Sequence, residues 1–141
     1  MEHLDGFYTM KGYAVLEDGE LTSAMEDYLE MIARIHAQGK SVRGNDLSRM
    51  LHVKASSVTK MVQQLAEAGL VTAEKYGVIV LTESGSKLGS YLLYRHNVLH
   101  SFLCLLNHSE NELEQVEKIE HFLDVRTIKN LEQLIQQLQK Y

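Results

Sequence analysis

The chain of 141 residues has one cysteine and no apolar run near the roughly 18 residues that a membrane-spanning helix requires. One cysteine excludes an internal disulfide, and Cys104, within the apolar run FLCLL, is expected to be a small buried hydrophobic side chain. The N-terminus, MEHLDGFYTM, has two acids before any lysine or arginine and no apolar run after it, which argues against a secretory signal. These absences predict a cytoplasmic protein without a membrane segment.

The sequence also has no internal repeat, no low-complexity segment, no glycine-rich phosphate loop and no set of residues typical of a catalytic nucleophile. We therefore do not expect an enzyme. What is present is an ordinary globular balance, with 45% apolar and 23% charged residues, which argues against disorder over most of the chain. The length suits one compact domain or two small domains that share a core.

The formal net charge of −5 argues at first against a nucleic-acid partner. The distribution of charge changes this expectation, because residues 1–22 carry five acids and one base, whereas residues 23–84 carry seven of each. Residues 85–141 carry seven acids and six bases. Since local patches rather than the total charge decide phosphate binding, a DNA-binding role stays open for the middle of the chain.

Three helices are predicted after an N-terminal extension at 1–22. The first begins near Thr22 or Ser23, where Ser23 and Glu26 have capping-box spacing, and it ends before Gly39. Its apolar face repeats at three and four residues, as one face of a helix does. The residues of this face are Met25, Tyr28, Leu29, Ile32 and Ile35.

Two shorter helices follow, at about 44–51 and about 55–68. Asn45 is the expected cap of the earlier one. Its expected buried residues are Leu47, Met50 and Leu51. The later helix ends at Gly69, and its apolar stripe consists of Val58, Met61, Val62 and Leu65.

Residues 70–82, LVTAEKYGVIVLT, differ in character from the helices before them. Two β-rich runs, Leu70–Ala73 and Val78–Thr82, flank the turn sequence EKYG, which is a hairpin signal. Three helices followed by a small hairpin is the winged-helix order, in which the second and third helices form the helix-turn-helix. Residues 23–84 are therefore expected to form a winged helix-turn-helix DNA-binding domain.

The remaining residues, 85–141, are expected to form an α-helical domain, so that the fold class is mainly α with a small β-hairpin. Ser84 can cap a long helix that runs to about 106, and further helices are expected at about 110–124 and about 127–140. The apolar face of the long helix comprises Leu88, Leu92, Leu99, Phe102 and Leu103. The stripe of the last helix comprises Ile128, Leu131, Leu134, Ile135 and Leu138. So much apolar surface on so few residues favours a dimer.

The start of the helix at about 55–68 has the composition of a DNA-recognition helix. Small hydrogen-bonding side chains there let the backbone approach base edges, and a lysine can reach a guanine edge or a phosphate. The residues of this polar face are Ser56, Ser57, Thr59, Lys60 and Gln63. Phosphate contacts are expected from Arg43, Lys54 and Lys75. Helix capping alone also explains a serine and threonine run, but its place between a second helix and a hairpin favours DNA reading.

Three groups of acids and histidines are candidate metal ligands. Asp27 and Glu30 are three residues apart on a predicted helix, and Glu117, Glu120 and His121 stand at i, i+3 and i+4, so the members of each set share a face. The groups are Asp27 with Glu30 on the first helix, His96 on the long helix, and Glu117, Glu120 and His121 in the segment VEKIEH. Each group taken alone is more often solvated or packed than metal-binding.

The neighbours of these groups favour a shared role. The first pair borders the apolar stripe of its helix, and VEKIEHFL interleaves its acids and histidine with apolar residues. Carboxylates that face a helix interface are costly unless they are paired or metal-bound, and four of them at one site would be offset by two divalent cations. Oxygen and imidazole ligands without a thiolate suit Mn2+ or Fe2+ and do not strongly select zinc or copper.

Five segments, in this order along the chain, resemble the manganese transport regulator branch of the diphtheria toxin repressor family. They are SAMEDYLEMI at 23–32, ASSVTKMVQQL at 55–65, YGVIVLTESG at 76–85, YRH at 94–96 and VEKIEHFL at 116–123. The likeness is colinear and spans about residues 23–140.

The resemblance implies a homodimer with a winged helix, a helical metal-binding and dimerisation domain at 85–141, and a two-metal site between them. The implied ligands are Asp27, Glu30, His96, Glu117, Glu120 and His121. The iron-sensing branch tends to have Met at position 27 and a Cys ligand on the later helix, and this sequence has neither, which favours Mn2+, two per subunit, over Fe2+. The implied function is a manganese-dependent repressor that binds a palindromic double-stranded operator and controls metal-ion uptake genes.

The hypothesis for the switch is that repulsion among the carboxylates loosens the first helix without metal, and that metal fixes the two recognition helices at the spacing of successive major grooves. An iron(II)-responsive repressor of the same family stays open. A winged-helix regulator that senses a non-metal ligand would also have the DNA-reading half, but it would not explain why the chain carries six candidate metal-binding residues. A carboxylate-bridged metal enzyme would use paired Glu-x-x-His elements, whereas Glu-x-x-Glu-His occurs here once.

Overall fold

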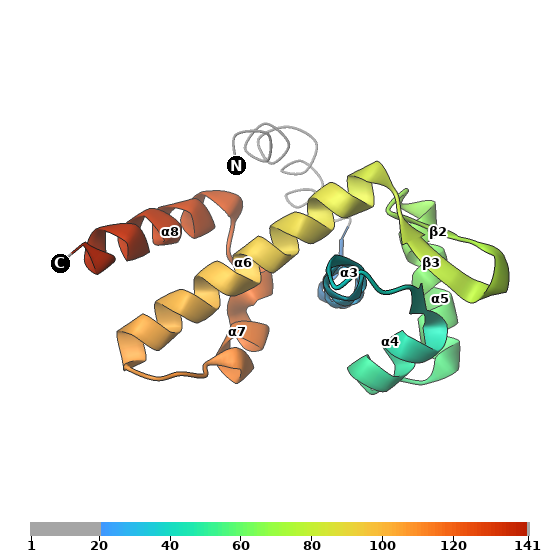
Figure 1. The fold of residues 1–141 in the computed structure, drawn as a ribbon, viewed down its shortest axis with the longest axis horizontal. Coiled ribbons are helices and arrows are strands. Elements are labelled where there is room, and N and C mark those ends of the chain that lie inside the picture. The colour runs from blue at the N-terminus through green and yellow to red at the C-terminus, as the bar shows by residue number, and fades with distance from the viewer. Residues whose placement is uncertain (1–20, 141) are drawn as a thin grey trace. The chain divides into compact units, whose positions relative to one another are not determined.

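The computed structural model describes residues 21–140, so the extension predicted at 1–22 lies outside the described residues except for its last two positions. The chain forms two units, Met1–Tyr91 and Leu92–Tyr141, which divide within the long helix α6 (Glu83–Asn107). Helices dominate the described residues, which also contain one three-stranded antiparallel sheet (Figure 1). The predicted class, mainly α with a small β element, is confirmed.

Helix α3 (Ser23–Ala37) supplies much of the core of the first unit. Its cap is Thr22, whose hydroxyl accepts the Met25 N–H at 3.1 Å, so the prediction of a cap at Ser23 is wrong. The threonine places its oxygen one position earlier, and Ser23 becomes the first helical residue. The predicted apolar face is confirmed, and its fully buried members are Leu29 and Ile32.

Helices α4 (Gly44–Leu51) and α5 (Ala55–Glu67) form the helix-turn-helix, and both pack against α3. The predicted cap of α4 at Asn45 is wrong. Asp46 instead accepts the backbone N–H of Arg43 at 2.9 Å, which makes Arg43 the N-cap. The start of α4 is therefore fixed by an acid in the first turn.

The apolar stripes of these two helices are buried in part. Leu47 of α4 is fully buried, but Met50 in the last turn is 44% exposed, against the prediction. The chain turns away from α4 at His52, which has a φ of 56°, so the last turn has less of the unit to pack against. On α5 the predicted stripe is confirmed, with Val58 and Leu65 buried and Met61 and Val62 half-buried.

Strands β2 (Val71–Ala73) and β3 (Val78–Leu81) form the predicted antiparallel hairpin, which is the wing. The turn between them contains Tyr76 and Gly77, both with left-handed φ values, of 63° and 76°. A third strand, β1 (Val42–Arg43), pairs with β3 and gives the strand order β1-β3-β2. Two residues are too short a run for an alternating pattern to reveal, so the sequence did not predict β1.

The start of α6 is held by Thr82 rather than by the predicted cap, Ser84. The Thr82 hydroxyl accepts the Gly85 N–H at 3.0 Å and donates to the Gly69 carbonyl at 2.6 Å. Ser84 lies inside the helix. One threonine side chain therefore joins the first turn of α6 to the loop between α5 and β2.

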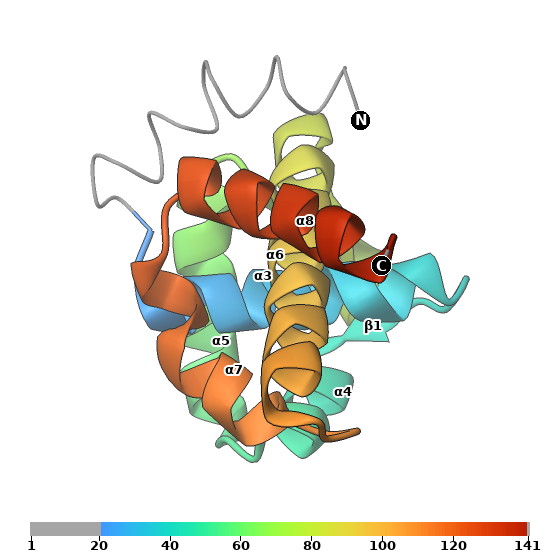
Figure 2. The same ribbon diagram turned by 90° about the vertical axis from the view of Figure 1, so that its left-hand side faces the viewer.

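In the second unit, the later half of α6 packs with α7 (Leu113–Ile119) and α8 (Val125–Gln139), as Figures 1 and 2 show. A 3-10 turn at Glu120–Phe122 follows α7. The helix predicted at about 110–124 is therefore too long, because Glu112 is the N-cap and the chain becomes extended at Leu123. The core draws residues from all three helices: Val98, Leu99, Leu103, Val116, Ile128 and Ile135.

Cys104 lies on α6 and is half-buried, so the expectation of a fully buried side chain is wrong. Its sulfur is 3.5 Å from His100 Nε2, which also accepts the backbone N–H of Glu112 at 3.2 Å. Cys104 thus borders the loop that leads from α6 into α7 rather than the centre of the core.

Several large apolar side chains of the second unit stay exposed. They are Leu105, Leu106, Leu113, Phe122, Leu134 and Leu138. Two of these belong to the stripe predicted for α8, whose Ile128 and Ile135 are buried. An apolar stripe wider than the core of one chain is typical of a subunit interface. Within residues 21–140 there is no helix with the length and hydropathy needed to cross a membrane.

Asp124 caps α8 and gives the second unit a pH-dependent contact. Its Oδ1 accepts the Thr127 N–H at 2.8 Å, and hydrogen bonds from Thr127 hold the pKa of Asp124 below its ordinary value of 3.8. Because the folded pKa is lowered, the stabilisation is complete above the unfolded pKa. It is lost as the pH falls through the folded pKa.

Replacing Asp124 with alanine is expected to lower the free energy of unfolding by about 1 kcal/mol near neutral pH, because α8 loses its cap. The difference from the unmodified chain should shrink as the pH falls below the ordinary value of 3.8 and through the lowered folded pKa, because the carboxylate then takes up a proton. Urea unfolding over a series of falling pH values measures this. Asp124→Asn, which keeps an oxygen acceptor, is the control, and a difference that does not change with pH would contradict the prediction.

Candidate metal centre and DNA-reading surface

The polar face of α5 is open to solvent, as a helix that enters a DNA groove requires. Its exposed residues are Ser56, Ser57, Thr59, Lys60 and Gln63. The Thr59 hydroxyl donates to the Ala55 carbonyl at 3.1 Å, so this group is already engaged within the helix. Lys60, the next residue, and Gln63, one turn further on, have longer side chains that reach past the backbone.

The three residues predicted to contact phosphates all lie in the first unit. Arg43 and Lys54 are exposed and are the N-caps of α4 and α5. Lys75 lies in the turn of the wing, between β2 and β3. Positive residues at helix N-termini combine with the backbone N–H groups there to favour anions. The surface is therefore suited to hold a phosphate backbone beside the recognition helix.

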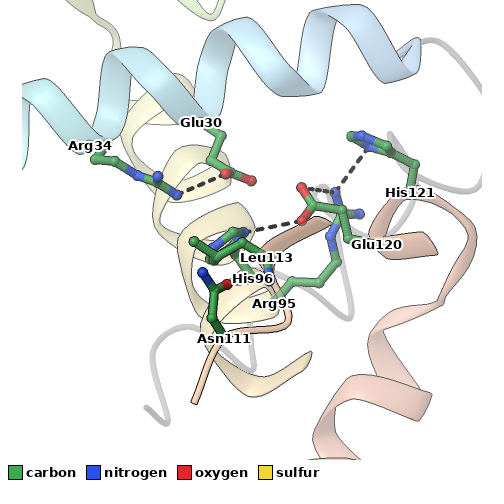
Figure 3. A network of polar contacts seen from close by, with 8 residues as sticks. All are labelled: Glu30, Arg34, Arg95, His96, Asn111, Leu113, Glu120 and His121. Atoms are coloured by element: carbon green, nitrogen blue, oxygen red, sulfur yellow. Dashed lines mark hydrogen bonds and ion pairs between the residues drawn. The ribbon is translucent and has the colours of Figure 1, made fainter. Parts of the chain in front are cut away.

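On α3, Asp27 and Glu30 border the buried face of the helix. Asp27 is exposed, whereas the side chain of Glu30 is 13% exposed and pairs with Arg34, with Oε2 and Nη2 2.9 Å apart (Figure 3). Sequence spacing did not single out Glu26, although it is only 5% exposed. The helix therefore carries one buried carboxylate, Glu26, one half-buried carboxylate, Glu30, and one exposed carboxylate, Asp27.

In the second unit, His96 of α6 and Glu120 of the 3-10 turn form a buried pair (Figure 3). Nδ1 of His96 and Oε2 of Glu120 are 3.2 Å apart, and the residues are 7% and 1% exposed. Ligand atoms of Glu120 and His121 also lie within 4.8 Å of one another. Since a buried carboxylate is costly without a cation or several donors, this group is the strongest candidate metal centre of the unit.

Glu117, Glu120 and His121 do not share one α-helical face, although their spacing predicted it. Helix α7 ends at Ile119, and the chain tightens into a 3-10 turn, which changes the angle between successive side chains. Glu120 is buried, His121 is half-buried, and Glu117 remains exposed on α7. The structure thus brings Glu120 and His121 together with His96, and leaves Glu117 outside this group.

Arg95 belongs to the same group, although neither residue type nor spacing singled it out in the sequence. It is 2% exposed, and its Nη2 lies 3.4 Å from Nδ1 of His121 and 4.0 Å from Oε1 of Glu120 (Figure 3). The signal that could have identified it is a lone arginine in the otherwise apolar run YLLYRHNVL. Such a charge is costly to bury unless it is paired.

The donor set fits a divalent cation of the manganese or iron(II) type. Neighbouring ligands of an octahedral ion with bonds of about 2.1 Å lie about 3 Å apart, and the His96–Glu120 separation of 3.2 Å agrees with this. The donors are carboxylate oxygen and imidazole nitrogen, which Mn2+ and Fe2+ accept. The one cysteine sulfur of the chain lies beside His100 instead.

Two consecutive segments of the chain match models of known protein families. Residues 20–79 match the family described as "Iron dependent repressor, N-terminal DNA binding domain". Residues 82–141 match "Iron dependent repressor, metal binding and dimerisation domain". Together the two matches cover most of the chain, in the order that the winged helix and the helical unit have in the structure.

Two curated relatives carry the name HTH-type transcriptional regulator MntR. The protein of Geobacillus thermodenitrificans (strain NG80-2) is 41% identical over 120 residues, which are 84% of this chain and 85% of the relative. The protein of Bacillus subtilis (strain 168) is 40% identical over 116 residues, 82% of each chain.

Among solved structures, the manganese regulator SloR is 27% identical with a TM-score of 0.70, and ScaR with bound Zn2+ is 25% identical with a TM-score of 0.67. Each match covers 79% of this chain and 53% of the other. The chain therefore spans about half the length of these two structures.

A winged helix-turn-helix joined to a helical unit with a buried histidine–carboxylate pair defines a metal-responsive transcriptional regulator. The chain belongs to the iron-dependent, or diphtheria toxin, repressor family, in its MntR branch. It is a metal-dependent DNA-binding repressor and not an enzyme, as the sequence predicted.

Proposed function

We propose that the chain is a manganese-responsive repressor of metal-ion uptake genes that acts in the cytoplasm as a homodimer on a palindromic double-stranded operator. The observation that carries this proposal is the buried pair of His96 and Glu120, an imidazole and a carboxylate without a sulfur ligand. Mn2+ accepts such donors. The names of the relatives, MntR and the manganese regulator SloR, support the same metal.

The proposed ligands are Asp27, Glu30, His96, Glu117, Glu120 and His121. Four carboxylates and two imidazoles are more donors, and more negative charge, than one divalent ion satisfies, so we propose two ions per subunit. Fe2+ shares these ligand preferences. Asp27 favours manganese, since the iron-sensing branch tends to have methionine at this position.

The proposed DNA contacts come from the exposed face of α5 and its flanks. Base edges would be read by Ser56, Ser57, Thr59, Lys60 and Gln63, and phosphates held by Arg43, Lys54 and Lys75. The exposed apolar residues of the second unit supply a self-complementary interface. A two-fold dimer then presents two recognition helices, which matches a palindromic operator.

Helix α3 supplies the coupling between metal and DNA within the first unit. Leu29 and Ile32 of this helix are fully buried, and α3 packs against both α4 and α5. Since Asp27 and Glu30 stand on the same helix, a restraint on their carboxylates also restrains the helix-turn-helix. A bound divalent cation supplies the charge that removes repulsion between the carboxylates. The DNA-competent arrangement is then favoured by population shift.

The test is DNA binding with and without metal. A duplex is first selected from a random library with the protein and Mn2+, and its affinity is then measured by fluorescence anisotropy. We expect the affinity with Mn2+ to exceed that with chelator by about 100-fold, at the upper end of usual coupling factors. Fe2+, Zn2+ and Co2+ are compared in the same assay.

Equal affinity in Mn2+ and in chelator would overturn the proposed function. A response to Fe2+ at lower free concentration than to Mn2+ would support the iron(II)-responsive alternative. Metal binding together with turnover of a small substrate, and no DNA selected, would contradict the repressor assignment itself.

A further inference from the structure

We propose that Arg95 is a built-in counter-ion that sets the affinity of this chain for Mn2+. Its guanidinium lies beside Glu120 and Nδ1 of His121, and its charge opposes the cation that would take both groups as ligands. This inference rests on the proposed function. The residues concerned, Arg95, Glu120 and His121, all belong to the second unit.

The first step is the permanence and burial of the charge. An arginine side chain does not deprotonate in a protein, so Arg95 stays positive in every state of the site. Arg95 and Glu120 are 2% and 1% exposed, and water therefore screens their interaction little. Salt would screen the charge of a surface arginine and so weaken its effect on metal binding, whereas it screens the charge of a buried arginine much less.

The second step is what the guanidinium does to the two ligands. Nδ1 of His121 lies 3.4 Å from Nη2, and because a guanidinium donates hydrogen bonds and accepts none, Nδ1 can only be the acceptor in this contact. That lone pair is thus in use within the chain. Oε1 of Glu120 faces the same Nη2 at 4.0 Å, while Oε2 faces His96 at 3.2 Å. Arg95 therefore holds the side chains of Glu120 and His121 in place and competes with a metal ion for both.

The third step is the net effect on affinity. Without Arg95, the site of Glu120 and His96 loses one buried positive charge. A single neighbouring charge within about 4–6 Å changes the affinity of a carboxylate for a proton by one to three powers of ten. We therefore expect removal of the arginine charge to raise the affinity for Mn2+ by about tenfold or more, and to make the metal-free chain less stable because a buried carboxylate loses a neighbouring positive charge.

The experiment compares the full chain with Arg95→Met, Arg95→Gln and Arg95→Lys. Methionine and glutamine remove the charge and keep much of the length, while lysine keeps the charge. Mn2+ affinity is measured without DNA, from the electron paramagnetic resonance signal of the free ion, and thermal unfolding is recorded with and without Mn2+. Arg95→Met and Arg95→Gln should bind Mn2+ about tenfold more tightly, melt lower without metal, and gain more from Mn2+ than the unmodified chain. Arg95→Lys should bind like the unmodified chain.

The outcomes separate this inference from the proposed function. If the unmodified chain binds no Mn2+ in this assay, both fail. If it binds, and the charge-free variants bind no more tightly, the counter-ion role alone is overturned and Arg95 only positions its neighbours. An equal gain in Arg95→Lys would also overturn it, because the charge would not be the cause. If Arg95→Met does not fold, the comparison of Arg95→Gln with Arg95→Lys decides.

Discussion

Glu120→Gln is expected to abolish the response of DNA binding to manganese. The substitution keeps the volume of the side chain and one of its oxygens, but removes the charge that faces His96 at 3.2 Å and Arg95 at 4.0 Å. Changes in residues that only support a metal ligand already cost about 10–100-fold in affinity. Loss of a ligand charge should therefore lower the affinity for Mn2+ by about 100-fold or more.

Two measurements check this expectation: direct Mn2+ titration without DNA, and anisotropy of the selected duplex with and without Mn2+. The matched control is Glu114→Gln, another acid-to-amide change, on α7. Glu114 is exposed and pairs with Lys118, with Oε1 and Nζ 3.3 Å apart, and the control should leave both measurements unchanged. A normal manganese response in Glu120→Gln would remove Glu120 from the proposed ligands.

Lys60→Ala is expected to weaken DNA binding and to leave Mn2+ affinity unchanged, so it separates metal binding from DNA reading. Lys60 is exposed on α5 in the first unit, and no proposed metal ligand lies on that helix. Its loss should weaken DNA binding by about 1–3 kcal/mol if it reaches a base edge. Mn2+ affinity should stay that of the unmodified chain. The two variants together show whether the two sites are distinct in one folded protein.

Apolar periodicity predicted the position of most elements because it reports burial directly. The stripes of α3 and α5 and the two runs of the wing lie where the sequence placed them. The predicted caps were one or two residues away from the observed ones. Thr22 caps α3 in place of Ser23, and Thr82 holds the start of α6 in place of Ser84. The choice between hydroxyls so close in sequence depends on packing. For Thr82 the deciding contact is the Gly69 carbonyl, which is distant in sequence.

The residue types of the candidate site could be predicted from the sequence. Their arrangement in space could be predicted only in part. Residue type and spacing selected Glu117, Glu120 and His121 as a group, but a helical spacing assumes that the helix continues. Helix α7 stops at Ile119, and only then does Glu120 become buried. The role of Arg95 could not be read from spacing, because its contacts with Glu120 and His121 join segments that are far apart in the chain.

The close approach of α6 to the loop after α5 makes Gly85 the most sensitive glycine among the described residues of the first unit. A Cβ atom at this position would lie 1.8 Å from the carbonyl oxygen of Leu70 and 2.8 Å from its carbonyl carbon. Leu70 cannot give way easily, since its N–H donates to the Leu65 carbonyl at 3.0 Å and its own carbonyl accepts the Thr82 N–H at 3.1 Å. The clash is with backbone that two hydrogen bonds hold in place.

Gly85→Ala should therefore lower the free energy of unfolding by about 3 kcal/mol or more, the upper range for overpacking, and the melting temperature by about 10 °C. The gain in helix propensity, about 1 kcal/mol, does not offset this. The control is Gly44→Ala, at the first residue of α4, where a Cβ atom would meet Val58 Cγ1 at an ordinary 3.7 Å. Urea unfolding of the metal-free chain should show the control at or above the stability of the unmodified protein. If the two alanine variants were equally stable, α6 would not pack on the Leu70 backbone as closely as the structure has it.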